Sequence, residues 1–120
     1  MYIKYENVVK GYGSLVEEFG SEILIFFGED APETLKDYCY LINTKSLDKE
    51  ITEGDYLEIN GIKTKIIAVG DQANRNLDLL GHLTIHLSGR VDDILPGAIV
   101  CQEVDFDKIK IGSKLKIWEE

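Results

Sequence analysis

Two histidines, His82 and His86, lie in one apolar stretch, "GHLTIHLSG" at residues 81–89, and they are the only imidazoles of the chain. A neutral imidazole nitrogen can act as a nucleophile, carry a phosphoryl group or bind a metal ion near neutral pH. In a helix, residues four positions apart lie about 6 Å from each other and can share a metal. In a strand, at about 3.3 Å per residue, they lie about 13 Å apart and cannot. The secondary structure of this stretch therefore decides its chemistry.

The residues around the histidines favour a strand. Thr84 and Ile85 are β-branched, a side-chain type that is enriched in strands. Alternation along a strand places both histidines and Thr84 on one face and the intervening aliphatic residues on the other. A metal site shared by the pair is therefore not expected. His82 directly follows Gly81 at a helix-to-strand junction, whereas His86 lies deeper in the strand as a surface or cross-strand residue.

Turn residues and hydrophobic periodicity predict the elements that position these histidines. Asn60 and Gly61 separate two alternating segments within residues 56–69, and this pair is preferred in two-residue hairpin turns. Within residues 70–81, apolar residues recur at helical spacing, Asp71 can cap the start and a glycine can close the end, which predicts a helix. The other expected elements are strands at 2–9, 22–27 and 38–43, within 95–103 and within 112–118, and a short helix within 28–38 with Asp30 as its N-cap.

These elements predict a mostly β protein, a small closed β-barrel of about seven short strands with two short helices, because long helices for a doubly wound sheet are missing. The segments "ITEGDYLEI" (51–59) and "IKIGSKLKI" (109–117) share the frame I-x-x-G-x-x-L-x-I. In both, a glycine precedes a strand, as where a strand re-enters a small barrel from a turn. The length of the chain indicates a single domain, residues 1–120.

Composition narrows the classes of function. The chain carries 22 acidic against 13 basic residues, a net charge of −9, which argues against nucleic acid and anionic membrane surfaces as partners. It has no apolar leader and no apolar run long enough to span a bilayer, so a cytoplasmic protein without membrane insertion is expected. Cys39 and Cys101 lack C-x-x-C spacing, which favours two buried thiols over a redox pair or a metal site. No phosphate-binding glycine loop is present, and no metal or cofactor is expected.

Three segments carry a family resemblance: "GEDAPETLKDYCYLI", "AVGDQANRNLDLLGHLTIHLSG" and "LPGAIV". In this order and spacing they resemble the glucitol/sorbitol-specific enzyme IIA component of the bacterial phosphoenolpyruvate-dependent sugar phosphotransferase system, over nearly the whole chain. The most specific part is the block A-V-G-x-x-A-x-x-N-L-x-x-L-G-H-x-T at residues 68–84. The resemblance implies a cytoplasmic β-barrel phosphotransferase that receives a phosphoryl group on histidine from the phosphocarrier protein HPr and passes it to the IIB component, which phosphorylates the incoming hexitol.

Position 42 departs from the pattern of this family. The resemblance implies a phosphoacceptor histidine three residues beyond the cysteine of A-P-x-x-L-x-x-Y-C, where this chain has Ile42. Three interpretations stay open: His82 of the L-G-H-x-T block is the acceptor, the chain is a degenerate non-catalytic paralogue that acts as a binding or regulatory module, or His86 substitutes. A structural His82, hydrogen-bonded to backbone at a helix–strand corner, fits the sequence as well as an acceptor does.

If His82 is the acceptor, neighbouring polar groups must hold the phosphoryl oxygens, because transfer depends on positioning and on donors to those oxygens. The candidates are Arg75, Asn76 and Asn74 on the predicted helix and Thr84 on the same strand face. Arg75 can make bidentate contacts to phosphate, although by itself it also fits a solvated helix residue. Asp71 and Asp78 are expected at the rim of a surface that attracts a basic HPr.

Overall fold

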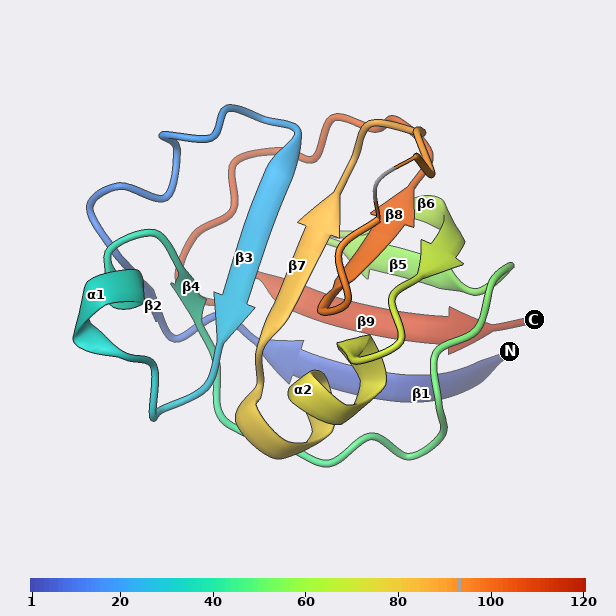
Figure 1. The fold of residues 1–120 in the computed structure, drawn as a ribbon, viewed down its shortest axis with the longest axis horizontal. Helices are drawn as coiled ribbons and strands as arrows, with labels where there is room; N and C mark the ends of the chain where they lie inside the picture. Colours follow the sequence, from blue (N-terminus) through green and yellow to red (C-terminus); the bar gives the residue numbers. More distant parts are fainter. Residues whose placement is uncertain (93) are drawn as a thin grey trace.

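The computed structural model describes residues 1–92 and 94–120, which form nine strands and two helices (Figure 1). In chain order these are β1 (Tyr2–Val8), β2 (Gly11–Tyr12), β3 (Ile23–Phe27), α1 (Glu33–Lys36), β4 (Tyr40–Leu41), β5 (Tyr56–Ile59), β6 (Ile62–Val69), α2 (Ala73–Leu80), β7 (Leu83–His86), β8 (Ala98–Cys101) and β9 (Lys114–Glu119). The strands make one curled sheet in the order β1-β9-β5-β6-β8-β7-β3-β4-β2. Neither described helix is long and apolar enough to cross a membrane.

The mostly β class with two short helices is confirmed, but the barrel is open where a closed one was predicted. The edge strands are β1 and β2, and no ladder joins them in the part of the chain that the structure describes. Val9 and Lys10 connect them instead, and their amides donate to Ser113 O (2.9 Å) and Leu41 O (2.8 Å). The strand that was not predicted is β2, because its two residues are too few to show a period.

The sheet folds back on itself around an apolar core. In Figure 1, β3, β7 and β8 form one wall, β1, β9 and β5 cross behind it, and α2 lies at one end between them. Inward-facing side chains of both walls, among them Phe26, Ile85 and Ile117, are fully buried in a single cluster. The wall of β3 and β7 therefore has one face in the core and one face turned outward.

The predicted hairpin at residues 56–69 is confirmed as β5 and β6. Asn60 and Gly61 have φ values of 55° and 80°, and a type I′ turn requires positive φ at both central residues. Ile59 and Ile62 pair directly beside the turn. Because the turn is only two residues long, it fixes the register of the whole hairpin.

Both helices are confirmed, but neither predicted N-cap is. Gln72 occupies the N-cap of α2 without a side-chain cap hydrogen bond, and Asp71 is exposed. Pro32 occupies the N-cap of α1, in place of Asp30. Proline supplies a fixed φ at a helix start but no capping oxygen. The buried residues Ala73 and Leu77 hold α2 against the core, whereas α1 has no buried residue.

Gly81 ends α2 at a point that is too tight for a side chain. Its φ is 69°, and a Cβ there would lie 2.8 Å from the backbone nitrogen of Gly28. The Gly28 amide donates to Leu80 O at 3.0 Å, so the end of the helix rests on the end of β3. The glycine thus allows the close approach that places residue 82 beside β3.

We expect Gly81→Ala to lower the free energy of unfolding by about 3 kcal/mol, because the cost of a left-handed conformation and the cost of a backbone clash are summed. Urea denaturation measures the loss. Gly20→Ala is the matched control, since Gly20 has a φ of 76° but nothing within 4 Å of its Cβ position. The control should lose only about 1 kcal/mol. Equal losses would show that the approach to Gly28 imposes no constraint.

Candidate functional site

His82 lies at the predicted corner, between the end of α2 and the start of β7. Its imidazole stacks on the ring of Phe27, with centroids 4.3 Å apart and planes inclined by 12°. Its backbone amide donates to Asn76 O in α2 at 3.2 Å. The corner is therefore fixed by the backbone, and the plane of the imidazole is fixed by the aromatic ring beneath it.

The imidazole nitrogens of His82 are open to solvent. Within residues 1–92 and 94–120 the ring has no hydrogen-bond partner, and no side-chain nitrogen or oxygen is buried without one. The side chain is half-buried, and this burial lowers the pKa of His82 below its ordinary value of 6.5. The ring is therefore neutral at pH 7 and holds a free lone pair, which is the form that attacks an electrophile.

His86 occupies the same face at the far end of β7. It pairs with Ile23 of β3 and lies in a hollow that Ser88 and Arg90 also line. Burial lowers the pKa of His86 as well, so both imidazoles are neutral at pH 7. No aromatic ring within residues 1–92 and 94–120 stacks on His86, in contrast to His82. The strand places the two imidazoles too far apart to share a metal, and the described residues contain no group of three or more metal-ligating side chains.

Two of the predicted neighbours, Thr84 and Asn76, lie on the His82 side of α2. The Thr84 amide donates to Gly97 O at 3.3 Å, and a Cβ on Gly97 would lie 3.1 Å from Asn76 Nδ2. Thr84 is also two residues along the same strand face from His82. Thr84 thus shares the strand face of the imidazole, and Asn76 adjoins His82 through its backbone oxygen.

Arg75 and Asn74 lie on the other side of α2. Arg75 lines a hollow with the segment 47–50, and His82 does not line it. Asn74 Oδ1 accepts from the Ile51 amide at 2.7 Å and its Nδ2 donates to Ile51 O at 3.2 Å. Asn74 therefore anchors the segment before β5, and the structure does not bring Arg75 beside His82.

Ile42 lies inside the protein. Its amide donates to Phe27 O at 2.9 Å, directly after the parallel pairing of Phe27 with Leu41. Its side chain is 2% exposed and belongs to the core, whereas the imidazole of His82 stands on the outward face. Residue 42 and His82 therefore occupy opposite faces of the same sheet, and His82 does not fill the place of a side chain at position 42.

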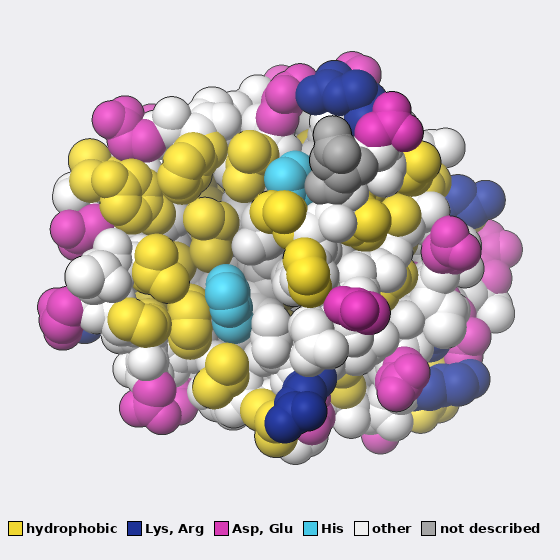
Figure 2. Space-filling model, in the orientation of Figure 1, with side chains coloured by type: hydrophobic (Ala, Val, Ile, Leu, Met, Phe, Trp, Pro, Cys, Tyr) yellow, Lys and Arg dark blue, Asp and Glu magenta, His cyan; other side chains and the backbone are white. Residues whose placement is uncertain are grey.

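The surface around the histidines was not predicted. Figure 2 shows both imidazoles within a largely hydrophobic area, with acidic side chains mainly toward its margin. Sheet alternation assigns Ile23, Ile25 and Phe27 of β3 to this area, together with the exposed Leu80 at the end of α2. We call these residues and His82 the histidine face. Sequence alternation shows which residues share a face, but it does not reveal that β3 lies beside β7.

Comparison with known proteins identifies the family of this chain. The family model described as the PTS system glucitol/sorbitol-specific IIA component matches residues 4–116. The PTS system glucitol/sorbitol-specific EIIA components of Escherichia coli and Shigella flexneri are each 29% identical over 117 residues, which cover 97% of this chain and 95% of the relative. The crystal structure of a PTS system IIA component from Enterococcus faecalis superposes with a TM-score of 0.83 at 26% identity, covering 95% of this chain and 99% of that chain. Since the family match spans nearly the whole sequence, the resemblance is confirmed, and the chain belongs to the glucitol/sorbitol-specific IIA family of the PTS.

Proposed function

We propose that this protein is a phosphoryl carrier of a hexitol phosphotransferase system, which accepts a phosphoryl group from HPr on His82 and passes it to the IIB component. The observation that supports the proposal most directly is the neutral, solvent-reaching imidazole of His82 stacked on Phe27. Membership of the PTS IIA family supports partners within that system. No cofactor is needed for a transfer between two imidazoles.

The proposed transfer forms one phosphorus–nitrogen bond and breaks another. A neutral nitrogen of His82 attacks the phosphorus of phosphorylated HPr, and the histidine of HPr leaves with the electron pair of the broken bond. The Phe27 ring holds the attacking imidazole in one plane, which lowers the entropy lost in reaching the in-line geometry. Asn76 and Thr84 supply an amide and a hydroxyl for the phosphoryl oxygens. Transfer to the IIB component runs the same step with His82 as the leaving group.

The histidine face supports docking of a partner whose own histidine lies among basic residues, as the family resemblance implies for HPr. Its apolar centre provides area to bury, and acidic side chains lie mainly toward its margin (Figure 2). The predicted rim residue Asp78 is engaged elsewhere, because its Oδ1 accepts from the Leu47 amide at 2.8 Å. Asp30 is exposed two residues after Gly28 and provides a cleaner test of steering.

We expect Asp30→Lys to slow HPr association several-fold with little change in dissociation, because rim charges act mainly on the encounter. Association with the wild-type protein should also slow as salt shortens the reach of charges to about 8 Å at physiological ionic strength. Stopped-flow binding measures both rates. Glu53→Lys, an equal charge change at an exposed site on the turn before β5, is the control. Equal slowing by both variants would assign the effect to net charge and not to the histidine face.

Incubation of the full chain with phosphoenolpyruvate, enzyme I and HPr tests the proposal. Intact-mass spectrometry should find one acid-labile phosphoryl group, and peptide mapping should place it on His82. If active HPr leaves the chain unlabelled, the second candidate, a non-catalytic binding or regulatory paralogue, takes its place. The observation that favours this second candidate is that Ile42 fills the core where the resemblance implies an acceptor.

A further inference from the structure

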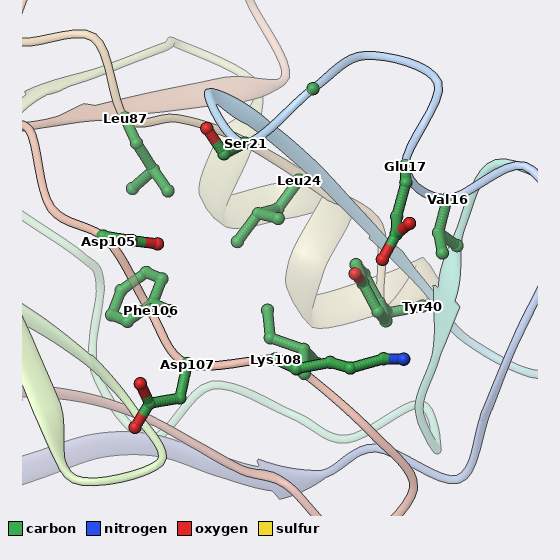
Figure 3. A pocket seen from close by; sticks show the side chains of 12 residues that line it. Val16, Glu17, Ser21, Leu24, Tyr40, Leu87, Asp105, Phe106, Asp107 and Lys108 are labelled. Atoms are coloured by element: carbon green, nitrogen blue, oxygen red, sulfur yellow. The ribbon is translucent and has the colours of Figure 1, made fainter.

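A cavity of about 370 Å³ opens between the start of β3 and the loop that precedes β9 (Figure 3). Leu24 and Leu87 line it from the inner face of the sheet, and Phe106 lines it from the loop. Leu87 lies five residues beyond His82, about 16 Å along the strand, and on the opposite face. The cavity is therefore separate from the histidine face, and its volume is typical of small-molecule sites.

One polar group in the cavity wall has no partner. Tyr40 is only 6% exposed, and its ring packs on Phe26 with centroids 5.6 Å apart. Its hydroxyl forms no hydrogen bond within the described residues, yet no described side-chain oxygen is buried without a partner, so the hydroxyl opens into the cavity. Figure 3 shows it on the side of the Glu17 carboxylate. Burial, followed by the charge of Glu17, raises the pKa of Tyr40, so the hydroxyl stays protonated.

The mouth of the cavity is negatively charged. Glu17, Asp105 and Asp107 face a single cation, Lys108, around it, and none of the four belongs to an ion pair within residues 1–92 and 94–120. In Figure 3 the carboxylate of Asp105 is directed across the cavity. Apolar walls strengthen the field of such charges. A ligand that suits this cavity must carry a positive charge and an apolar body.

We propose that the cavity binds a small organic cation, a primary ammonium carried on an apolar body. The ammonium donates to the Tyr40 hydroxyl and to the Glu17 carboxylate on the same side of the cavity (Figure 3). The carboxylate of Asp105 adds to the negative field from the opposite side. The body packs against Leu24 and Phe106. The site is independent of phosphoryl transfer, and nothing in the reaction proposed for His82 uses it.

Titration of 2-phenylethylamine into the full chain tests this, with calorimetry for affinity and amide NMR shifts for location. The controls 2-phenylethanol and 3-phenylpropionate have a similar body without the positive charge. We expect the amine to bind at least tenfold more tightly than the alcohol, no saturable binding of the carboxylate, and shifts around the cavity. Equal affinities of amine and alcohol, or shifts confined to the histidine face, would overturn the proposal.

Variants separate the groups that bind the cation. Tyr40→Phe removes one hydrogen bond and should weaken amine binding about fivefold, the equivalent of about 1 kcal/mol. Asp105→Asn, at an exposed position, should weaken it by a similar factor at low salt and less at high salt. Glu53→Gln should leave the affinity unchanged. If Asp105→Asn binds like the Glu53→Gln control at low salt, the electrostatic part of the proposal is wrong.

Two further binding measurements distinguish the possible sources of the cation. A lysine side chain of a partner protein has the same chemistry, and Nα-acetyl-lysine amide is its probe. Tighter binding of this probe than of 2-phenylethylamine assigns the cavity to a polypeptide lysine, and weaker binding assigns it to a free amine. His82→Ala should bind 2-phenylethylamine as the wild type does, so that failure of phosphoryl transfer and failure of this site give different results.

Discussion

His82→Ala is expected to abolish labelling of this protein by phosphoenolpyruvate, enzyme I and HPr, whereas His86→Ala is expected to keep it. Only two imidazoles exist in the chain, and among the described residues His82 is the one that rests on an aromatic ring, with Phe27 4.3 Å away. Thr84 shares its strand face, and Asn76 O accepts from its backbone amide. Intact-mass spectrometry of the two variants measures the phosphoryl group directly. Both side chains are partly exposed on one sheet face, so neither substitution empties the core.

Labelling that persists in His82→Ala would end the assignment to this residue, and its loss in His86→Ala would move the assignment to the other end of β7. The pH dependence gives a second readout. Burial sets the pKa of His82 below 6.5, so the neutral, nucleophilic ring still predominates at pH 6.5. In single turnover with phosphorylated HPr, the contribution of His82 to the rate should decline at low pH with a midpoint below pH 6.5. A decline already centred above pH 6.5 would show that the imidazole is not desolvated.

The same pKa shift affects stability. The unfolded chain binds a proton at His82 near pH 6.5, and the folded chain binds it only at lower pH. Between these two values the unfolded state holds more protons, so the free energy of unfolding rises with pH there. The contribution of His82 to stability is therefore fully present above pH 6.5 and is lost as pH falls from 6.5 through the lower, folded-state pKa.

Much of the fold could be predicted because the signals are local. The hairpin depends on Asn60 and Gly61, whose left-handed conformations are encoded by residue type alone. The end of α2 depends on Gly81 in the same way. Edge pairing is not local. Whether the sheet closes depends on which strands β1 and β2 pair with, and hydrophobic periodicity within a strand does not predict its pairing partners.

For the residues near His82, alternation along the strand is a local signal, whereas the rotation of α2 about its axis is not. Alternation placed Thr84 beside His82, but the rotation of α2 decides which helix residue joins them. Successive helix residues are about 100° apart, and the buried Ala73 and Leu77 turn toward the core. This leaves Asn76 on one flank, while Arg75 points away from the core. A helical wheel centred on the buried pair would have separated these two residues from sequence alone.

The burial of Lys4 could not be predicted from alternation along its strand. Lys4 and Tyr5 are both buried, although strict alternation would expose one of them. A register shift between Ile3 and Tyr5, where β1 pairs with β9, accounts for this. A bulge adds a residue to one strand only, and its position depends on the partner strand. Patterns within one strand therefore fail at such a point.

The second large effect is expected at Asp55, the counter-ion of this buried lysine. Lys4 Nζ lies 2.7 Å from Asp55 Oδ2, and the two side chains are 1% and 4% exposed. The ammonium also donates to Glu50 O at 2.8 Å. Asp55→Ala removes the nearer partner and leaves the buried ammonium with only Glu119 Oε2, 3.9 Å away and partly exposed. A buried ion that loses its partner costs about 3–5 kcal/mol. That is a large part of the roughly 5–15 kcal/mol by which domains are stable.

Urea denaturation of three variants separates the causes. Lys4→Met should lose less stability than Asp55→Ala. In Lys4→Met the Asp55 carboxylate still accepts a hydrogen bond from the Thr52 amide at 2.8 Å, and a methionine side chain fills most of the lysine volume. The double variant should lose less than the sum of the single losses, since neither charge is then left alone. Lys49→Ala is the surface control: Lys49 Nζ also lies 2.7 Å from a carboxylate, Glu119 Oε1, but its side chain is 57% exposed. Exposed pairs contribute about 0–1 kcal/mol, so a loss in Asp55→Ala no larger than in Lys49→Ala would mean that burial adds nothing to this pair.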